Sequence, residues 1–418
     1  MSGKGREVDD VIGLTKLLCG KATVSEALRT DRGRRPHLLQ FSPAAGPMVV
    51  WNVTARCNLQ CVHCYAQGPA GDQELSTAEA RGLIDDLATL GVPVLLFSGG
   101  EPLLREDIFD LIAYARSRDL RPSLSTNGTL IDDETARRLA EVGAAYVGVS
   151  LDGLEATHDR FRAQPGAFAR ALAGLRTARD AGLKTGIRFT VTRDNVSDLP
   201  ALLALVEEER IPRFCLYHLV YAGRGRGLRE RDLSPEERRR VIEDLMQTTL
   251  DWCRRGVEVE VLTTDNHADG VLVLRHVEKH QPERAAEVRE LLRLAGGCSA
   301  GRKFAQVDPW GNVHPCQFWP EVSLGNVRER PFSQLWREGG HETVAQLRRM
   351  PASLTGQRCG RCVYQEYCGG CRVRALWCGD EWGDDPSCPL SEEELLASAP
   401  SRAATGEGEA SEEDQCHA

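Results

Sequence analysis

The sequence has no long uninterrupted run of apolar residues and no excess of positive charge. A membrane-spanning helix needs about 20 consecutive apolar residues, and the N-terminus shows no leader of the secretory type, so we expect a cytoplasmic protein. With 52 Lys and Arg against 61 Asp and Glu, the net charge of −9 indicates neither nucleic acid nor an anionic membrane as partner. Hydrophobic residues form 41% of the 418 residues, a globular composition suited to two or three structural units.

Cysteine, by contrast, is abundant, with 15 residues. In a cytoplasmic chain this number indicates metal binding at more than one centre rather than a disulfide scaffold. Cys57, Cys61 and Cys64 follow an apolar run with the spacing C-x3-C-x2-C. Three thiolates on one short loop can bind three irons of a 4Fe–4S cluster and leave the fourth iron without a protein ligand. A structural zinc ion, in contrast, is normally bound by four protein ligands. The spacing therefore predicts an iron–sulfur site that can chelate a small molecule.

Apolar strand candidates alternate with amphipathic helix candidates over the first half of the chain. The expected strands are residues 48–54, 92–98, 121–126, 145–151, 184–192 and 213–219. The expected helices are residues 77–90, 106–117, 133–142, 168–181 and 198–209. This alternation indicates a parallel sheet with crossover helices. Six repeats predict an α/β fold, a partial (β/α)6 barrel of the TIM type, with its chemistry at the carboxyl ends of the strands.

Changes in composition divide the chain further. We expect residues 1–46 (an N-terminal helical arm), 47–225 (the barrel core), 226–295 (a helical linker), 296–390 (a small cysteine-rich domain) and 391–418 (an acidic, disordered tail). In the arm, Leu14, Leu17 and Leu18 share one helical face. The linker follows a glycine-rich turn and is expected to contain helices at residues 235–254 and 282–294. The cysteine-rich domain has few periodic runs, which is typical of a fold organised by metal.

A second motif follows the second strand, Ser-Gly-Gly-Glu-Pro at residues 98–102. Two glycines let the backbone approach a ligand closely, and a carboxylate at a strand end can meet an ammonium group. Together with the cysteine triplet one strand earlier, this turn resembles the radical S-adenosylmethionine (radical SAM) enzymes. The resemblance implies that the cysteines bind the cluster, that SAM chelates its open iron, and that the turn contacts the SAM amino group. The residues concerned are Cys57, Cys61, Cys64, Gly99, Gly100 and Glu101.

Polar residues at later strand ends are further candidates. Ser125 and Asn127 end the third strand, and Ser150 and Asp152 end the fourth. Small polar groups there could hydrogen-bond a ribose, although they also serve as turn and cap residues. In the resembled family these positions line the SAM site. Arg188 on the fifth strand is a candidate for the SAM carboxylate, with a surface charge as the alternative.

The cysteine-rich domain resembles the SPASM domain, an extension that binds auxiliary 4Fe–4S clusters. That resemblance assigns one cluster to four cysteines: Cys359, Cys362, Cys368 and Cys388. The other cluster would use Cys298, Cys316 and Cys371, and its fourth ligand is open or unusual, because Arg302-Lys303-Phe304 stand where a cysteine is expected. The alternative is a zinc ribbon built on the two C-x2-C units, which would leave Cys298 and Cys316 without a role.

Longer strings narrow the resemblance. Residues 151–162, 217–225, 264–270 and 324–331 resemble the radical SAM proteins of heme d1 and siroheme-dependent heme synthesis. Those enzymes decarboxylate, remove or oxidise acetate or propionate side chains of an iron tetrapyrrole, and they need a reductant such as flavodoxin or ferredoxin. The strings do not agree on one member of the group, so the tetrapyrrole and the side chain stay open.

A tetrapyrrole with several carboxylates requires cations, which bidentate arginine supplies best. Arg224 and Arg226 on the glycine-rich segment are candidates, with solvated loop arginines as the alternative. His218 and His267 could contact the substrate, although a lone histidine is more often structural. Two other classes stay open: a radical SAM/SPASM maturase of a peptide or protein, and an iron–sulfur electron carrier without catalysis.

Overall fold

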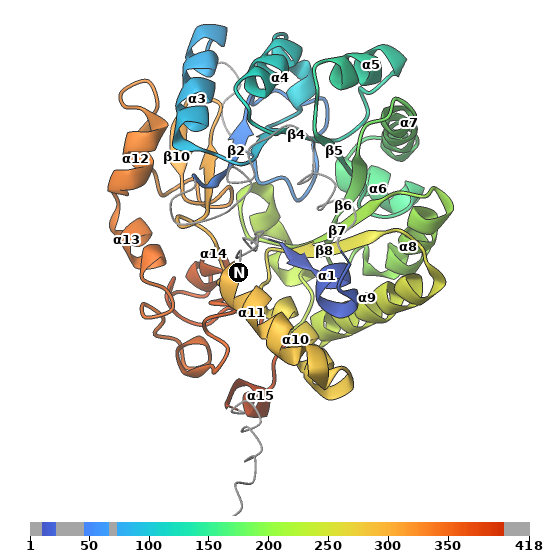
Figure 1. Ribbon diagram of the computed structural model, residues 1–418, viewed down its shortest axis with the longest axis vertical. Coiled ribbons are helices and arrows are strands. Elements are labelled where there is room, and N and C mark those ends of the chain that lie inside the picture. Colours follow the sequence, from blue (N-terminus) through green and yellow to red (C-terminus); the bar gives the residue numbers. More distant parts are fainter. Residues whose placement is uncertain (1–10, 22–45, 67–72, 397–418) are drawn as a thin grey trace, which may run out of the picture.

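One curved sheet of 11 strands organises the molecule (Figure 1). The computed structural model describes residues 11–21, 46–66 and 73–396. The strand order is β1-β8-β7-β6-β5-β4-β3-β2-β9-β10-β11. No helix in these described stretches is long and apolar enough to cross a membrane.

The six strands expected from the sequence form the centre of this sheet and are confirmed. They are β2 (Met48–Asn52), β3 (Leu95–Ser98), β4 (Pro122–Thr126), β5 (Tyr146–Ser150), β6 (Thr185–Val191) and β7 (Arg213–His218). Each pairs in parallel with the next along the chain. Most positions of these strands are buried, as expected for a parallel sheet that is covered on both faces. Their carboxyl ends therefore meet along one edge of the sheet.

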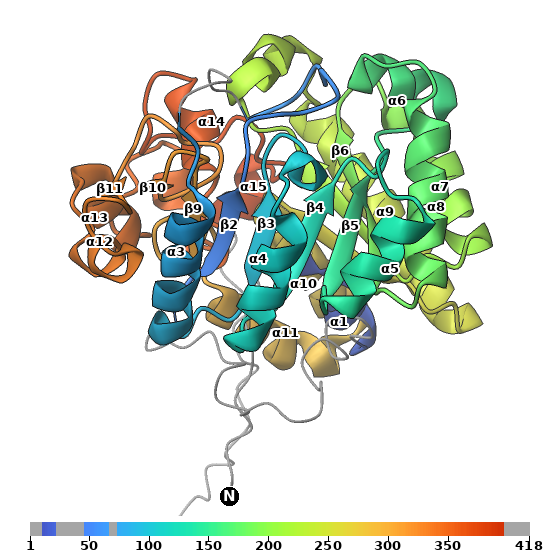
Figure 2. The same cartoon turned by 90° about the horizontal axis from the view of Figure 1, so that it is seen from above.

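The five expected crossover helices are also confirmed, and they lie on the outside of the sheet (Figure 2). They are α3 (Thr77–Leu90), α4 (Ile108–Ser117), α5 (Asp133–Glu141), α7 (Ala167–Asp180) and α8 (Leu199–Glu208). Local sequence fixes their ends: Ser76 and Glu79 form a capping box at the start of α3, and Gly91 ends that helix in the left-handed conformation. An additional helix that the sequence did not predict, α6 (Glu155–Arg162), follows β5.

The prediction of a helical linker over residues 226–295 is wrong in one respect. This segment also contains a strand, β8. β8 (Glu260–Thr264) pairs in parallel with β7, and the short strand β1 (Ile12–Gly13) pairs antiparallel on its other side. The five residues of β8 are all buried, including Glu260, whose carboxylate lies 2.7 Å from Nη2 of Arg213 on β7. An ion pair with another strand thus allows a charged residue in a buried strand.

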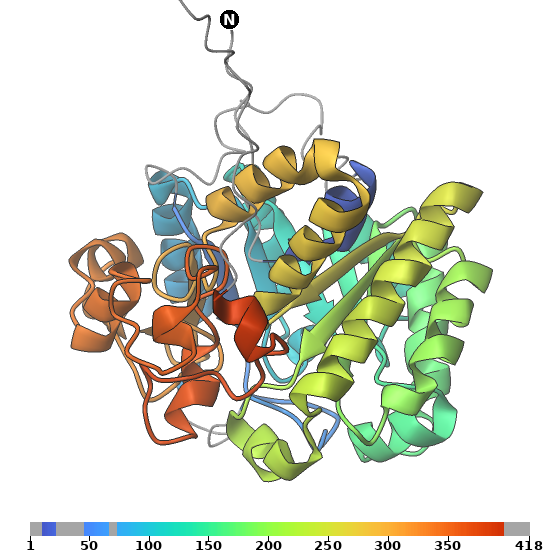
Figure 3. The ribbon, with the colours of Figure 1, turned by 90° about the horizontal axis from the view of Figure 1, so that it is seen from below.

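Helices do make up most of that segment. They are α9 (Pro235–Arg255), α10 (Ala268–His280) and α11 (Ala285–Ala295), preceded by the 3-10 segment η4 (Gly223–Arg231). In Figure 3, α10 is gold and lies beside the dark blue helix α1 (Leu14–Cys19), which contacts both α10 and α9. Leu14, Leu17 and Leu18 of α1 are buried there. The rest of the expected arm, residues 1–10 and 22–46, lies almost entirely outside the described residues.

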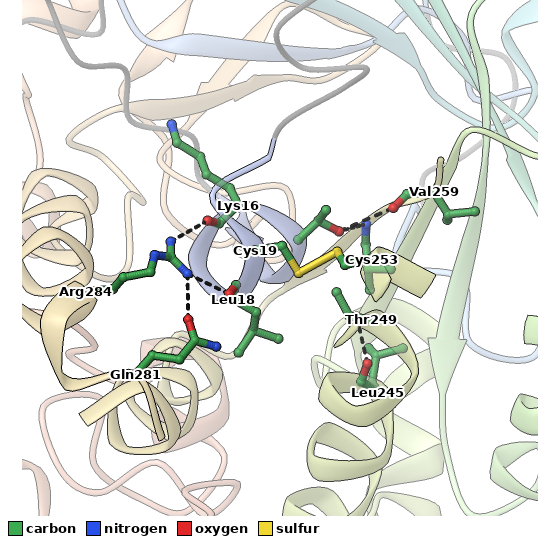
Figure 4. The surroundings of a disulfide bond; sticks show 11 residues. Lys16, Leu18, Cys19, Leu245, Thr249, Cys253, Val259, Gln281 and Arg284 are labelled. Carbon is green, nitrogen blue, oxygen red and sulfur yellow. Dashed lines mark hydrogen bonds between the residues drawn. A yellow bond between two sulfur atoms is a disulfide. The ribbon is translucent and has the colours of Figure 1, made fainter. Parts of the chain in front are cut away.

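A disulfide between Cys19 and Cys253 joins α1 to α9, with 6.7 Å between the Cα atoms (Figure 4). The cysteine pattern predicted metal sites and no disulfide, and this cross-link corrects that prediction. Nearby, Nη1 of Arg284 donates to the carbonyl of Leu18 at 2.6 Å. The N-terminal helix is therefore attached to the barrel through a covalent bond, a hydrogen bond and buried leucines.

The cysteine-rich domain continues the core sheet. β9 (Phe304–Val307) pairs in parallel with β2, and β10 (Asn312–His314) and β11 (Gly325–Asn326) extend the sheet as antiparallel strands. The helices of this domain are short: α12 (Phe332–Glu338), α13 (Glu342–Arg348) and α14 (Arg372–Leu376). One continuous hydrophobic cluster runs from Ile12 to Leu395. The two units thus share a sheet and a core.

The tail expected to be disordered from residue 391 begins with a helix instead. α15 (Glu392–Leu396) follows Ser391, and Glu394 pairs with Arg239 of α9. Leu395 is buried in the common core, which explains why an acidic segment is ordered here. Residues 397–418, with Cys416, lie outside the described residues.

Candidate active site

The cysteine triplet occupies the loop that leaves β2. Cys61 is buried, Cys64 is half-buried and Cys57 is exposed. Arg105 holds the start of this loop, because its guanidinium donates to the carbonyls of Val53 and Leu75, each at 2.8 Å. The loop therefore presents its thiols at the carboxyl edge of the sheet on a fixed backbone.

The Gly-Gly-Glu turn after β3 packs directly on this loop. The N–H of Gly100 donates to the carbonyl of Thr54 and that of Glu101 to the carbonyl of Arg56, both at 2.8 Å. A Cβ on Gly100 would lie 2.2 Å from the Arg56 oxygen, and Gly99 has a φ of +137°. Only glycine tolerates this approach and this conformation. The two motifs that are separate in the sequence thus form one structural unit.

Glu101 is fully buried beneath the turn. Its Oε1 accepts from the Thr126 hydroxyl at 2.7 Å, and its Oε2 accepts from the backbone N–H of Asn127 at 2.8 Å. Burial raises the pKa of Glu101 to about 7, against the lowering effect of these hydrogen bonds. In this structure the carboxylate holds the end of β4, and its contact with a SAM amino group stays a prediction.

Asn127 continues this connection. Its Nδ2 donates to Oδ1 of Asn58 in the cysteine loop at 2.8 Å, and its Oδ1 accepts from the N–H of Thr129 at 2.9 Å. The side chain is buried and committed to protein partners. Asn127 therefore positions the cysteine loop. Ser125 and Ser150 are half-buried at the ends of β4 and β5.

Asp152, expected to hydrogen-bond a ribose, is instead enclosed in a buried network. Its carboxylate forms an ion pair with Arg162 and lies 3.5 Å from Nε2 of His63. Burial alone would raise the pKa of Asp152, but the neighbouring Arg162 holds it below its usual value. Burial also lowers the pKa of His63 to about 4.

Arg162 at the end of α6 is a functional candidate that sequence reasoning missed. Its Nη1 donates to Sγ of Cys61 at 3.4 Å, while the same guanidinium pairs with Asp152. A guanidinium in this position can hydrogen-bond a cluster sulfur. The Asp-Arg-Phe-Arg string that follows β5 contains this residue, but only the fold brings it to Cys61.

A cavity of about 1170 Å³ opens beside the cysteine loop. The three cysteines and Gly100 line one side of it, together with Tyr65. The remaining wall carries three arginines, an imidazole and an indole: Arg56, Arg224, Arg226, His314 and Trp310. The cavity thus combines thiols, cations and flat aromatic rings.

The glycine-rich segment η4 forms part of this wall. Nε of Arg224 donates to the carbonyl of Cys61 at 2.7 Å, and its backbone N–H donates to the carbonyl of Cys64 at 2.9 Å. Arg226 pairs with Glu321 and lies over the Trp377 ring, 5.0 Å from its centroid. Arg224 is therefore tied to the cysteine loop, whereas Arg226 is held through an exposed ion pair at the rim.

The structure does not bring every predicted site residue to the cavity beside the cysteine loop. His218 has no exposed side-chain surface, and its Nε2 lies 2.7 Å from Oδ2 of Asp269. Its Nδ1 is within hydrogen-bonding distance of the Arg238 guanidinium. That pairing makes His218 a core residue, which corrects the expected substrate contact. Arg188 lies 4.6 Å from the ring centroid of Tyr217 and lines a second cavity, as does His267.

The auxiliary cysteines line two other cavities, in the two sets that the sequence suggested. One of these is the cavity lined by Arg188 and His267. Cys359, Cys362, Cys368 and Cys388 all line one small cavity of about 20 Å³. A second cavity of about 100 Å³ is lined by Cys298, Cys316 and Cys371. Cys378 is exposed and Cys215 is buried in β7, and neither lines these two cavities.

The surroundings of the thiols fit iron–sulfur clusters. Burial of the sulfur raises the pKa of Cys57 to about 11, although part of that residue is exposed, and burial raises the pKa of Cys388 to about 11 as well. A bound metal would favour the thiolate form at both positions. Backbone N–H groups donate to several of the sulfurs, including Leu59 to Cys57 at 3.4 Å and Gly370 to Cys368 at 3.3 Å. Such hydrogen bonds to sulfur are among the features that tune a cluster.

Comparison with known proteins agrees with this geometry. The model of the radical SAM superfamily matches residues 51–206, and that of the SPASM iron–sulfur cluster-binding domain matches residues 298–372. The second match favours iron–sulfur clusters over the zinc-ribbon alternative. Among solved structures, a chain described as native anSMEcpe with bound AdoMet superposes with a TM-score of 0.64 at 20% identity, covering 82% of this chain and 93% of that one.

Two curated relatives are much more similar in sequence. The Fe-coproporphyrin III synthase of Methanosarcina barkeri is 50% identical over 395 residues, 92% of this chain and 99% of the relative. The pre-heme d1 synthase of Dinoroseobacter shibae is 44% identical over 362 residues, 85% of this chain and 89% of the relative. The chain therefore belongs to the radical SAM superfamily, whose domain binds a 4Fe–4S cluster and SAM, and it carries a SPASM domain for auxiliary iron–sulfur clusters.

Proposed function

We propose that this enzyme modifies acetate or propionate side chains of an iron tetrapyrrole in heme biosynthesis, with Fe-coproporphyrin III as its product. The observation that carries the proposal is the large cavity that the cluster cysteines and three arginines line together. The 50% identity to an Fe-coproporphyrin III synthase over nearly the whole chain supports the choice of product.

The cavity has the chemical character that such a substrate requires. Arg56 and Arg226 line it as cations for carboxylates, and their guanidinium groups can bind a carboxylate through two parallel hydrogen bonds. Tyr65 and Trp310 supply flat rings against which a planar macrocycle can pack. The volume of about 1170 Å³ lies slightly above the range of ordinary ligand pockets. It therefore has room for a large substrate.

Each set of residues has a distinct part in the proposed reaction. Cys57, Cys61 and Cys64 would hold the catalytic cluster, and Gly99, Gly100 and Glu101 would orient SAM beside it. When bound, the cluster and SAM supply a 5′-deoxyadenosyl radical that takes a hydrogen atom from an unactivated C–H bond. Arg224 keeps the glycine-rich segment on the cysteine loop, so that the cavity wall and the cluster keep a fixed separation.

A second candidate is the synthesis of pre-heme d1, supported by the 44% identity to the Dinoroseobacter shibae enzyme. The two candidates share the substrate class and differ in the side chains that are changed. Peptide maturation receives less support, because the mycofactocin maturase of Mycolicibacterium smegmatis is 31% identical over 374 residues. An electron carrier would not need the cavity beside the cluster.

The direct test is anaerobic incubation of the reconstituted protein with didecarboxysiroheme, SAM and a chemical reductant. Absorbance and mass spectrometry should show Fe-coproporphyrin III together with 5′-deoxyadenosine. A product that retains acetate groups but has altered propionates would favour the pre-heme d1 candidate. Unchanged pigment during active SAM cleavage would contradict the tetrapyrrole proposal, and parallel incubation with a precursor peptide would test the maturase alternative.

Substituting Arg226 tests the substrate part of the proposal. Arg226→Ala removes a cation from the cavity wall and should raise KM for the tetrapyrrole roughly 10- to 100-fold, because a hydrogen bond to a charged group contributes about 1.5–3 kcal/mol. The rate of SAM cleavage without substrate should be unchanged. Arg229→Ala is the matched control, because Arg229 lies in the same segment, donates to the carbonyl of Trp377 and does not line the cavity.

The electron donor and the location form part of the same proposal. A cluster of this type requires a low-potential electron, for which flavodoxin or ferredoxin is the expected source. Twelve cysteines of the described residues are free, and one pair, Cys19 and Cys253, forms a disulfide. Free cluster thiols persist in a reducing compartment, and on the basis of this majority we place the enzyme in the cytoplasm. Reduction of the cluster by purified flavodoxin or ferredoxin, followed by EPR, tests the donor.

A further inference from the structure

The second auxiliary site has three cysteines, and no fourth cysteine of the described residues lines its cavity. The residues that follow Cys298 do not supply a ligand either. Nε of Arg302 donates to the carbonyl of Cys298 at 3.1 Å, and Nζ of Lys303 donates to the carbonyl of Leu294 at 2.7 Å. Both side chains are cations engaged with backbone carbonyls. A fourth protein ligand for a cluster held here would have to come from another part of the chain.

The cavity is closed on its other side by the barrel. Thr264 ends β8, and Asp265 and His267 follow it; all three line the same space as Cys298 and Cys316. The barrel strand that the sequence analysis missed thus delivers an oxygen donor and a nitrogen donor to the auxiliary site. Carboxylate and imidazole groups are both ligands that iron accepts in proteins.

The backbone of Asp265 is unusual. Its φ is +67°, in the left-handed region, which is uncommon for a residue other than glycine. Such a conformation has an energetic cost and persists where the surrounding structure requires it, frequently at functional sites. Here it redirects the chain at the end of β8, between the strand and α10.

We propose that Asp265 is the fourth protein ligand of the auxiliary cluster held by Cys298, Cys316 and Cys371. The cluster would then be bound by three cysteines of the SPASM domain and one carboxylate of the barrel. It would join the two units and have no iron open to a substrate. This inference depends on the auxiliary cluster and not on the tetrapyrrole, so the proposed function and the ligand can fail separately.

His267 is the rival donor, and the backbone geometry favours Asp265. Asp265 is the residue whose left-handed φ turns the chain at the end of β8, directly beside the cavity. His267 belongs to the start of α10, where it occupies the N-cap position and its backbone carbonyl accepts from the N–H of Gly270 at 3.1 Å.

The test uses the full chain with the catalytic cluster removed by the substitutions Cys57→Ala, Cys61→Ala and Cys64→Ala. Asp265→Ala, Asp265→Cys and His267→Ala are added separately, each protein is reconstituted anaerobically, and the reduced clusters are recorded by EPR with iron analysis. We expect Asp265→Ala to shift one auxiliary signal and to make it respond to added cyanide. The parent and His267→Ala should not respond. Asp265→Cys should keep the parent iron content, show a shifted signal and give no cyanide response.

Three results would overturn the assignment. An unchanged auxiliary signal in Asp265→Ala would exclude the carboxylate, and a cyanide response already present in the parent would show an open iron. A nitrogen coupling in ¹⁵N-labelled parent that disappears in His267→Ala would identify the imidazole instead. If Asp265→Ala does not fold, the Asp265→Cys variant is used to test the ligand. Full iron content with a shifted EPR signal of the auxiliary cluster supports the proposal, and an unshifted EPR signal contradicts it.

Discussion

Single residues around the cysteine loop determine how that loop is held. Gly100 permits the contact between two motifs, Glu101 and Asn127 connect the loop to β4, and Arg162 reaches Cys61 from α6. These residues have their protein partners in place before any cofactor binds. We therefore expect their substitution to change the cluster first and the substrate kinetics as a consequence.

Arg162→Gln should lower the midpoint potential of the catalytic cluster, because the lost positive charge and hydrogen bond stabilise the reduced, more negative state. It should also destabilise the fold by about 3–5 kcal/mol, since Asp152 would be buried without its cation. Potentiometric EPR measures the first effect and chemical unfolding the second. Arg160→Gln on the exposed face of the same helix is the control and should change neither.

A double variant separates the two effects of Arg162. Adding Asp152→Asn to Arg162→Gln removes the uncompensated charge and should recover much of the stability. The potential should stay low, because the cation beside Cys61 is still missing. A potential equal to that of the parent in both variants would show that Arg162 has only a structural role.

Gly100→Ala should abolish stoichiometric binding of the catalytic cluster, because its Cβ would lie 2.2 Å from the carbonyl oxygen of Arg56 and would separate the two loops. Iron and sulfide analysis should show the loss of one cluster with the auxiliary clusters retained. Gly82→Ala is the matched control: Gly82 lies in α3 with nothing within 4 Å of an added Cβ. That substitution should be neutral or stabilise the protein by about 0.5–1 kcal/mol. Full iron content in Gly100→Ala would contradict the role of this contact.

At the scale of elements, the sequence predicted what local pattern determines. The six strands and five crossover helices have apolar periodicity, and the cysteine spacing marks the cluster loops. β8 could not be predicted in the same way, because it is five residues long and begins with Glu260, whose burial depends on Arg213. Likewise, His218 and Asp152 suggested substrate and ribose contacts, but Asp269 and Arg162 from other elements make them core residues.

Glu260→Ala should destabilise the protein by about 3–5 kcal/mol, since it leaves Arg213 without its carboxylate partner in a nearly buried position. Unfolding in urea, with cluster content held equal, measures this change. Glu258→Ala, two residues earlier and exposed, serves as control and should change stability by less than about 0.5 kcal/mol. Equal stability of the two variants would show that the ion pair is not required for β8.

At the scale of the whole molecule, the barrel and the SPASM domain form one body. They share a sheet through the pairing of β2 with β9 and one hydrophobic cluster. Cys298 comes before β9, Cys316 lies between β10 and β11, and the other auxiliary cysteines follow β11. The three cluster sites are therefore attached to one sheet. The sequence could separate the two units by composition, but it could not show that the sheet continues between them.

The central claim is that the loop after β2 holds a cluster with one iron open to SAM. The most direct measurement is 5′-deoxyadenosine formation by reduced, reconstituted protein and by its Cys57→Ala variant, with absorbance recorded for both. We predict that the parent cleaves SAM, whereas Cys57→Ala does not and still shows the absorbance of the auxiliary clusters. Continued SAM cleavage by Cys57→Ala, or zinc in place of iron at this loop of the parent, would contradict the claim.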